Sequence, residues 1–397
     1  MSLIAGSASA VGPDLRATLL PAELVSLFDD RFVASCDFIE EYVFRLALGI
    51  VRELEFERLL AKGVTVEEIV ASVDLDPTAA APLVDWLLRL LAERGVIARG
   101  QGSPSRFRGN GDLPVLDPAE IEQAQAAHDP AALPAFRLAA LAAEGYLRVM
   151  RGEAAGESVL FGADQIAAWF EYFSNQNPLY AVSNDIGARA VLARLPRPRG
   201  KILEIGGGAG SGALALFDRF AAAGALERIE SYRFTELSPL FLRRGQRALA
   251  SRPDLRDRLT HACLDIDRPF DEAGIKPASL AVVYGVNTLH VARDLAFTLH
   301  EIRTALMPGG VLVASECVRP FPGRTVYVEF VFALLEPFRA PVLHPVWRPN
   351  GGFLTPEQWF AAFRAAGLAE PFVWPDIPRI RERYPAFVVA AVGAARP

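Results

Sequence analysis

The sequence is poor in cysteine, in long hydrophobic runs and in positive charge, and each shortage argues against one class of protein. Its three cysteines, Cys36, Cys263 and Cys317, are far apart and odd in number, which argues against a disulfide framework and against a zinc knuckle. No run of about eighteen uncharged apolar residues occurs, so we expect no membrane contact. The start of the chain lacks the pattern of a secretion signal, so we expect a cytoplasmic location. The formal charge of −6 argues against a nucleic-acid partner.

The chain does contain enough apolar sequence for sizeable cores. It has 397 residues, 51% of them hydrophobic, and a usual domain size of ~150 residues predicts about two domains. Helical spacing dominates before residue 196, and strands alternate with helices after it. We therefore expect an α/β fold with a Rossmann-like sheet behind a mostly helical N-terminal region. The predicted parts are residues 1–110, a helical bridge over 111–195, and a ligand-binding domain over 196–397.

A glycine-rich turn at residues 202–213 (ILEIGGGAGSGA) is the most informative stretch of the chain. Glycine has no Cβ and tolerates a positive φ, so such a turn after a strand brings bare backbone close to a ligand. The spacing Gly208-x-Gly210-x-x-Ala213 weakly satisfies the dinucleotide fingerprint. Glu204, two positions before Gly206, instead suits a ligand with cationic and hydroxyl groups. Both interpretations are open at this point.

Further carboxylates follow at the ends of successive predicted strands. Glu236 follows the strand at 231–235, where an acidic residue in a doubly wound sheet receives ribose hydroxyls. Asp265 ends the next apolar stretch, where it can accept from an adenine amino group. Strands at 280–284 and 311–315 come next, separated by a helix over 295–306 and a turn at 308–310. The predicted cofactor contacts are Glu204, Gly206, Gly208, Gly210, Glu236, Leu237, Asp265, Ile266 and Asn287.

His290 and Glu316 are the candidate catalytic residues. His290 follows the fourth predicted strand and Glu316 ends the fifth, and the ends of adjacent strands lie about 5 Å apart. Ligands of open α/β sheets bind outside these carboxyl ends. Glu316 would fix the tautomer of the imidazole while the other ring nitrogen takes a proton from an acceptor.

These motifs resemble class I S-adenosylmethionine methyltransferases, and more specifically the methyltransferase domains of polyketide synthases. The resemblance covers about residues 180–395 and rests on YRFTELSPLFL, LDID, NTLHVARDL, MPGG and the ASE that ends in Glu316. It implies a seven-stranded sheet with an antiparallel last strand, S-adenosylmethionine as the cofactor, and His290 with Glu316 as a catalytic dyad. Where the family often has Asp after the second strand, this chain has Glu236, which leaves ribose binding plausible.

The N-terminal region predicts a winged helix. Thr65 opens a capping box, a second helix begins at Pro77, and short strands follow at 96–98 and 105–108. Residues 64–110 carry five bases and six acids, and the helix from Pro77 is apolar, so a protein partner is favoured over a DNA groove. The segment resembles the dimerisation module of small-molecule O-methyltransferases, which implies a homodimer.

Aromatic residues indicate where an acceptor would bind. They gather on the helical bridge and in a segment over 319–355 that we expect to form a lid, because ligand sites are mostly apolar concavities at domain boundaries. His344 could also hold a metal together with His290, but no third ligand is visible, so we predict no metal. The predicted acceptor contacts are Trp169, Tyr172, Phe173, Phe330, His344 and Trp347.

The function predicted from the sequence is methyl transfer to carbon or oxygen of a small polyketide-like, phenolic or enolic acceptor, free or bound to a carrier protein. An NAD-dependent oxidoreductase is the alternative enzyme; Glu204 and the absence of a Tyr-x-x-x-Lys motif argue against it. The alternative outside enzymes is a regulator that senses a small ligand and binds DNA through the winged helix. A methyltransferase fold that performs another reaction is also open, because fold does not fix function.

Overall fold

The computed structural model describes residues 13–109 and 111–397. The expectation about a secretion signal concerns residues 1–12 and lies outside this range. None of the helices in the described ranges is long and apolar enough to cross a membrane. The described chain forms two compact units: residues 28–172 with 323–339, and residues 13–27, 173–322 and 340–397.

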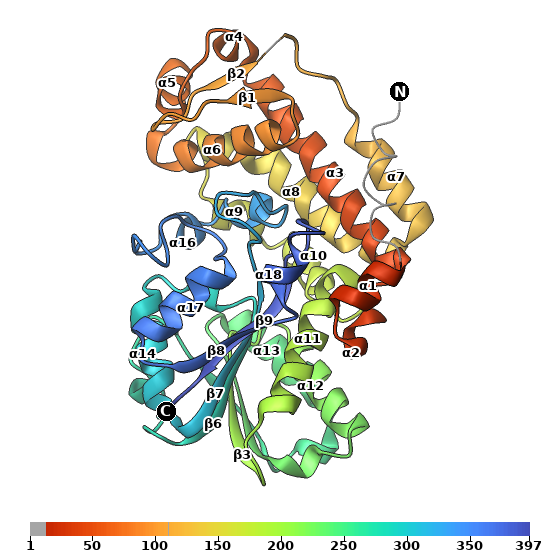
Figure 1. The fold of residues 1–397 in the computed structure, drawn as a ribbon, viewed down its shortest axis with the longest axis vertical. Helices are drawn as coiled ribbons and strands as arrows, with labels where there is room; N and C mark the ends of the chain where they lie inside the picture. Colours follow the sequence, from red (N-terminus) through yellow and green to blue (C-terminus); the bar gives the residue numbers. More distant parts are fainter. Residues whose placement is uncertain (1–12, 110) are drawn as a thin grey trace. The chain divides into compact units, whose positions relative to one another are not determined.

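The second unit is built on a seven-stranded sheet, as the sequence predicts (Figure 1). The strand order is β5-β4-β3-β6-β7-β9-β8, and every neighbouring pair is parallel except the two that involve β9. The predicted antiparallel last strand is therefore confirmed. The strands are β3 (Gly200–Ile205), β4 (Ile229–Glu236), β5 (Leu259–Cys263), β6 (Leu280–Val286), β7 (Leu306–Cys317), β8 (Ala369–Trp374) and β9 (Val389–Ala395).

The central strands are buried on both faces, which is why they read as continuous apolar runs in the sequence. All seven residues of β6 are buried, as parallel strands covered by helices require. Figure 1 shows α11 (Pro178–Arg194) and α12 (Ser211–Ala222) on one face, and α14 (Leu295–Ala305) and α17 (Pro356–Ala365) on the other. The remaining helices of this unit are α1 (Pro13–Leu19), α2 (Ala22–Val25), α13 (Pro239–Leu249) and α18 (Ile377–Ile380).

The predicted turn at 308–310 is a bulge inside β7 rather than a separate connection. The pairing of β6 with β7 shifts register between Leu280↔Leu306 and Val282↔Val311, so extra residues of β7 are accommodated there. Gly309 takes the left-handed conformation that the bulge needs, with φ of 73°. The strand therefore begins at Leu306, five residues before its predicted start.

The first unit is mostly helical, which confirms the helical N-terminal region. The predicted order of two helices and two antiparallel strands is present, and the capping box at Thr65 is formed. The long helix runs over Asp30–Glu53 and ends there because Glu55 takes a left-handed φ of 53°. The elements are α3 (Asp30–Glu53), α4 (Glu57–Leu60), α5 (Val66–Ser72), α6 (Pro77–Glu93), β1 (Ile97–Arg99), β2 (Phe107–Gly109), α7 (Pro118–His128), α8 (Leu133–Met150), α9 (Gly156–Leu160) and α10 (Ile166–Tyr172).

Residues 323–339 belong to this helical unit although they follow β7 in the sequence. They include α15 (Glu329–Phe332) and α16 (Glu336–Arg339). Trp86 Nε1 donates to Glu329 Oε2 at 2.9 Å, and the Thr325 hydroxyl donates to Glu93 at 2.7 Å. The apolar face of α6, predicted to need a protein partner, is thus largely buried inside its own unit. Homodimer formation stays a prediction.

Gly393 in β9 lies where the antiparallel strands of the sheet pack closely. A Cβ at this position would lie 2.0 Å from Leu312 O and 2.7 Å from the Phe372 ring. We expect Gly393→Ala to lower the free energy of unfolding by about 1–3 kcal/mol, because backbone must move to admit the methyl group. Gly49→Ala in α3 meets no heavy atom within 4 Å and should be neutral or stabilising. Urea unfolding of both variants checks this; equal stability in the two would contradict the described packing.

Candidate active site

The candidate site residues gather at the carboxyl edge of the sheet. Strands β4, β3, β6 and β7 are consecutive neighbours and parallel, so their ends lie side by side. Glu236 ends β4, the glycine turn follows β3, Asn287 follows β6, and Glu316 is near the end of β7. The sequence prediction that these residues share one edge is consistent with this topology.

The glycine turn needs its glycines for two separate reasons. Gly206, Gly208 and Gly210 have φ of 58°, 55° and 90°, a conformation that L side chains rarely adopt. A Cβ on Gly206 would also lie 2.5 Å from the Thr288 side chain, so the turn packs directly on the neighbouring loop. A Cβ on Gly208 would meet nothing within 4 Å, so the backbone there borders open space. This is a cradle of bare backbone at the sheet edge.

Glu204 lies beneath this cradle and is only 1% exposed. Burial raises the pKa of Glu204 to about 8; the neighbouring Tyr232 hydroxyl acts to lower this pKa, and the nearby Glu236 acts to raise it. Its Oε2 atom has no hydrogen-bond partner among the described residues. A buried carboxyl group that is kept neutral and incompletely bonded favours a cationic ligand, which would stabilise the ionised form.

Glu236 ties the two loops of the cradle together. Its carboxylate accepts hydrogen bonds from Gly208 N and Ser238 N, both at 2.9 Å. Burial raises the pKa of Glu236, and these two amides act in the opposite direction. A carboxylate offers about four lone-pair positions, so two remain for hydroxyl donors of a ligand.

The other predicted cofactor contacts lie on neighbouring loops. Asp265 Oδ1 accepts from Asp267 N at 3.0 Å, and Ile266 O accepts from the Thr298 hydroxyl at 3.1 Å. Leu237 is 56% exposed. Asn287 has a φ of 49°, and its Oδ1 accepts from Cys317 N at 3.0 Å. Asn is one of the few residues enriched in this left-handed region, and here it reverses the chain after β6.

Glu316 and His290 form a buried pair, 0% and 1% exposed. Glu316 Oε1 accepts from Thr288 N at 3.0 Å and from Leu289 N at 2.8 Å, while Oε2 lies 2.6 Å from His290 Nδ1. The carboxylate can only accept, so neutral His290 carries its proton on Nδ1. The lone pair is then on Nε2, as a general base requires. The structure therefore brings together the pair that the sequence predicted.

Arg348 is a part of this arrangement that the sequence analysis missed. Its side chain is fully buried and donates to His290 O at 2.7 Å and to Ala292 O at 2.6 Å. Burial lowers the pKa of Arg348 to about 10, so the guanidinium stays charged at neutral pH. Phe353 was missed as well, and its ring centroid lies 4.7 Å from that of His290. No sequence motif predicts either residue, because both are more than fifty positions from His290 in the sequence.

The predicted acceptor residues are divided between the two units. In the sheet unit, the rings of His344 and Trp347 stack with centroids 4.3 Å apart, and Phe173 lies edge-on to Tyr180 and Phe241. In the helical unit, Phe330 stacks on Tyr146, and Trp169 donates to Leu160 O at 2.6 Å. Tyr172 is edge-on to Trp169. Acceptor binding by these residues stays a prediction.

The structure gives no support for a metal centre. His344 Nδ1 accepts from Val346 N and Trp347 N, and His290 Nδ1 faces Glu316. Across residues 13–109 and 111–397, no group of three or more His, Cys, Asp or Glu is arranged to hold a metal ion.

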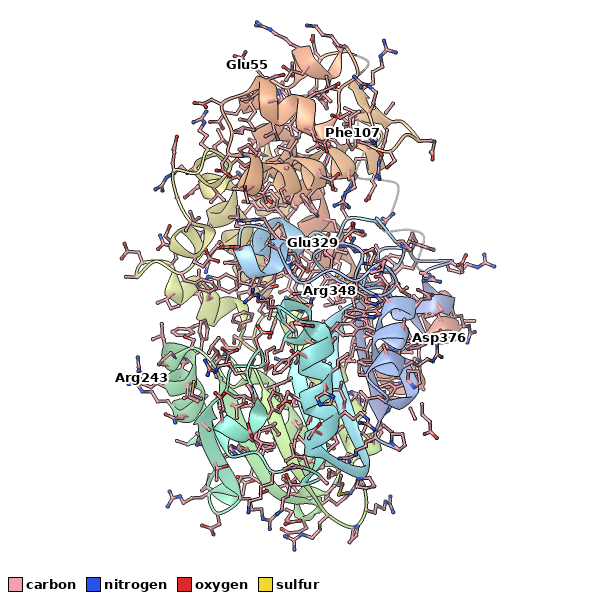
Figure 2. The ribbon with its side chains drawn as sticks, turned by 90° about the vertical axis from the view of Figure 1, so that its left-hand side faces the viewer. Glu55, Phe107, Arg243, Glu329, Arg348 and Asp376 are labelled. Atoms are coloured by element: carbon pink, nitrogen blue, oxygen red, sulfur yellow. The ribbon has the colours of Figure 1, made fainter. Side chains whose placement is uncertain are left out.

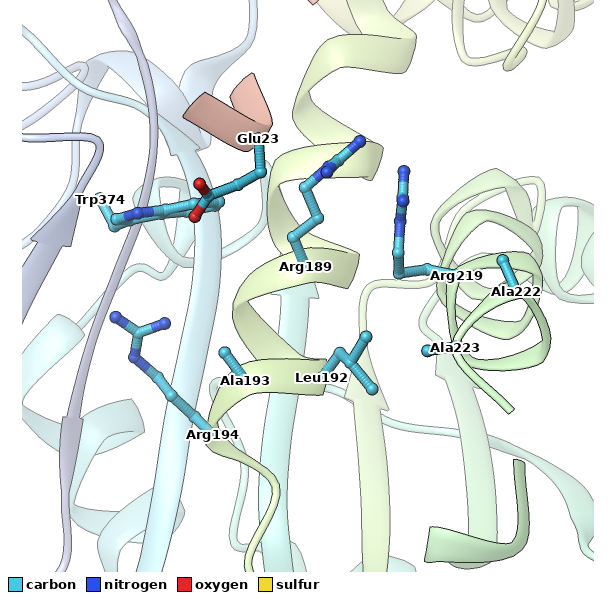
Figure 3. Close-up of a pocket in the computed structure, with 9 residues that line it drawn as sticks. All are labelled: Glu23, Arg189, Leu192, Ala193, Arg194, Arg219, Ala222, Ala223 and Trp374. Atoms are coloured by element: carbon cyan, nitrogen blue, oxygen red, sulfur yellow. The ribbon is translucent and has the colours of Figure 1, made fainter. Parts of the chain in front are cut away.

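A pocket of about 830 Å³ in the sheet unit lies away from these residues (Figure 3). It is bordered by α2, α11, α12 and the end of β8, and it shares no residue with the candidate site. Two of its arginines, Arg189 and Arg219, are bridged by Asp185 at 2.7 and 2.6 Å. Their charge is thus partly neutralised within the protein, and the carboxyl edge of the sheet remains the candidate active site.

Comparison with known proteins gives the class. The sequence profile of a methyltransferase domain matches residues 203–312. Non-reducing polyketide synthase dpmpA of Macrophomina phaseolina is 28% identical over 74% of this chain and 13% of its own length. Highly reducing polyketide synthase 2 of Gibberella zeae is 28% identical over 60% of this chain and 9% of its own length. The chain thus spans about a tenth of the length of these curated relatives.

Two solved structures share the fold along the whole chain. The CurJ carbon methyltransferase has a TM-score of 0.77 at 22% identity and covers 98% of both chains. The DszA carbon methyltransferase has a TM-score of 0.72 at 21% identity, over 100% of this chain and 96% of that one. The fold and the matched domain define an S-adenosylmethionine-dependent methyltransferase. The curated relatives that the chain resembles are polyketide synthases.

Glu204 gives the stability of the protein a testable pH dependence. Its pKa is about 8 in the folded chain against an ordinary value of 4.5, so between these values only the unfolded chain releases the proton. This group therefore makes the folded state less stable as pH rises from about 4.5 to 8. Glu204→Gln removes the titration.

We expect the wild type to lose stability relative to Glu204→Gln across this window, by on the order of a few kcal/mol. Urea unfolding at pH 5, 6, 7 and 8 measures the difference. Parallel stability curves for the two proteins would show that Glu204 is not held neutral by burial.

Proposed function

We propose that this methyltransferase transfers a methyl group to the acidic carbon between two carbonyls of a polyketide-like acyl substrate, with His290 as the general base. The observation that carries the proposal is the buried His290–Glu316 pair at the carboxyl edge of the sheet. A carbon acid must lose its proton to become a nucleophile, and this pair offers a neutral nitrogen for that proton.

The residues at the sheet edge fit S-adenosylmethionine. Open space over Gly208, the unsatisfied Glu204 Oε2 and the two remaining lone-pair positions of Glu236 support a ligand with a cationic part and ribose hydroxyls. S-adenosylmethionine bound there would supply an electrophilic methyl group on a sulfonium, with a neutral thioether as the leaving group. We propose Glu204, Gly206, Gly208, Gly210, Glu236, Leu237, Asp265, Ile266 and Asn287 as its contacts.

The chemistry of the pair follows from its hydrogen bonds. Nε2 of His290 takes the proton from the acceptor carbon, and the electron pair of that C–H bond stays on the carbon, which becomes the nucleophile that a methyl donor requires. Glu316 stabilises the resulting imidazolium, and the two backbone amides on its Oε1 keep it in place. The proton then passes to solvent. A positioned base of this kind supplies about 10²–10⁴ in rate, and alignment of the reactants supplies on the order of 7–11 kcal/mol.

The choice of carbon over oxygen is supported by what the relatives are named for. The two proteins with the same fold are called carbon methyltransferases, and the curated relatives are polyketide synthases. We propose that His344, Trp347 and Phe173 of the sheet unit contact the acceptor. Their stacked and edge-on rings offer the apolar surface that an acyl chain needs. Acceptor contacts by Trp169, Tyr172 and Phe330, which belong to the helical unit, stay a prediction.

Removing the base tests the proposal. We expect His290→Ala to lower the rate of methyl transfer to acetoacetyl-N-acetylcysteamine about 10²–10⁴-fold, because the carbon is no longer deprotonated in the site. Glu316→Gln should lower it by a smaller factor, because a neutral amide stabilises the imidazolium less. Both variants should still bind S-adenosylmethionine in calorimetry.

His300→Ala is the matched control, because His300 is exposed. It should keep the wild-type rate. Unchanged turnover in His290→Ala would remove the base assignment, whereas a loss of cofactor binding in that variant would assign His290 to the cofactor site instead.

A further inference from the structure

Helix α13 presents a cationic stripe to solvent. Leu240, Arg243, Arg244 and Arg247 are exposed, and their spacing of three and four positions places them on one side of the helix. Leu240 is one of the few large apolar side chains on the surface, at 41% exposure. Figure 2 shows Arg243 pointing away from the body of the sheet unit.

Two arginines of this stripe, Arg243 and Arg247, are not paired within the part of the chain that the structure describes. Helix α13 contains no acidic residue, and neither Arg243 nor Arg247 makes an ion pair or a side-chain hydrogen bond with any residue that the structure describes. Arg252, a few positions later, is instead paired with both Asp218 and Asp254. The chain as a whole carries a net charge of −6, so two uncompensated guanidinium groups on one side of a helix differ from its average.

The stripe starts at the edge of the candidate active site. Helix α13 begins three residues after Glu236, and its buried side packs under the glycine cradle: a Cβ on Gly245 would lie 3.2 Å from Gly208 O. Phe241, on the same buried side, meets the Phe173 ring at 6.0 Å. A partner seated on this helix would therefore lie beside the site and not at a remote surface.

We propose that Leu240, Arg243 and Arg247 form the docking surface for an acidic helical protein that carries the acyl acceptor as a thioester. The proposal rests on the proposed function. Charge complementarity selects the partner: two unpaired guanidinium groups beside one apolar side chain match an acidic helix with an apolar contact. Such a surface acts mainly by steering association and fixing orientation, so it changes the affinity for the carrier more than the chemical step.

The test compares one acceptor in two forms. Arg243→Glu/Arg247→Glu should raise KM for acetoacetyl groups on an acidic acyl carrier protein at least about tenfold, because two attractions become repulsions. It should leave kcat/KM for acetoacetyl-N-acetylcysteamine unchanged. Arg256→Glu/Arg383→Glu is the matched control: both residues are exposed, lie outside α13 and give the same change in net charge. Direct binding of the carrier protein, measured by fluorescence anisotropy at two salt concentrations, supplies a readout that does not depend on turnover.

Each outcome decides the proposal. Selective loss with the carrier-bound substrate, together with weaker and less salt-dependent binding, supports it. Equal loss with both substrates, no loss with either, or the same loss in the control variant overturns it. Binding of wild-type protein to phosphatidylserine vesicles, abolished in the variant while carrier binding persists, would assign the stripe to a lipid surface. Failure of the wild type to methylate either acceptor would overturn the proposed function. The docking proposal would then be decided by the binding of the carrier protein alone.

The side chain of Arg348 makes no ion pair in the described structure. Its two terminal nitrogens donate to the carbonyls of His290 and Ala292. The backbone of Arg348 is itself fixed by two hydrogen bonds with His344, both 2.9 Å, and Val342 N donates to Arg293 O at 2.7 Å. The segment over 342–348 is thus bonded to the loop that carries His290. Within that segment Val342, Leu343 and Val346 are exposed apolar residues.

We infer that Arg348 is a positioning residue that holds the His290 loop in the orientation its pairing with Glu316 requires. Arg348→Met should lower kcat by on the order of 10²-fold with little change in KM for acetoacetyl-N-acetylcysteamine, because a small displacement of the base is enough for such a loss. Arg348→Lys should recover part of the rate. In ¹⁵N-histidine spectra the wild type should show His290 protonated on Nδ1, and Arg348→Met a mixture of tautomers.

Arg228→Met is the matched control, since Arg228 also donates to two carbonyls, those of Leu192 and Leu195, but away from the site. It should lower the melting temperature without changing the histidine spectrum. Wild-type kcat in Arg348→Met, an unchanged spectrum, or the same loss of kcat in Arg228→Met would each contradict the inference.

Discussion

The carboxylate of Glu316 is the point on which the site depends. It is fully buried, and three N–H groups converge on it: the amides of Thr288 and Leu289 and the Nδ1 of His290. A buried carboxylate without such donors would be costly, and the donors are costly to bury without it. Glu316 therefore organises the loop after β6 and orients the imidazole through the same set of hydrogen bonds. The parallel pairing of β6 with β7 is what brings these segments together.

The two carboxyl groups near the glycine cradle, those of Glu204 and Glu236, lie in a different electrostatic environment from Glu316. Glu204 and Glu236 both have raised pKa values because they are buried, and neither forms an ion pair in the described part of the chain. Buried carboxyl groups without a counter-charge are a cost to the folded protein. A cationic ligand in the glycine cradle would offset that cost. The same buried carboxyl groups that destabilise the free protein therefore favour binding of the sulfonium of S-adenosylmethionine. Base and cradle thus lie on neighbouring strands with separate tasks.

The sheet and the candidate dyad could be predicted because their signals are local. Strands buried on both faces appear as apolar runs; His290 lies in the loop after one such run, and Glu316 lies near the end of the next. Arg348 and Phe353 could not be predicted, since their roles come from contacts with a loop more than fifty positions earlier. The assignment of residues 323–339 to the helical unit was missed for the same reason: Trp86 and Glu329 are 243 positions apart. The bulge at Gly309 was predicted as a turn because its local chemistry is that of a turn.

The position of the transferred methyl group tests the central claim most directly. The protein is incubated with S-adenosylmethionine labelled with ¹³C in its methyl group and with acetoacetyl-N-acetylcysteamine, and the product is examined by NMR. A base aimed at a carbon acid predicts the label on the carbon between the two carbonyls, coupled to its new carbon neighbour. Label on an oxygen, or no transfer of label from the bound donor, would contradict the account.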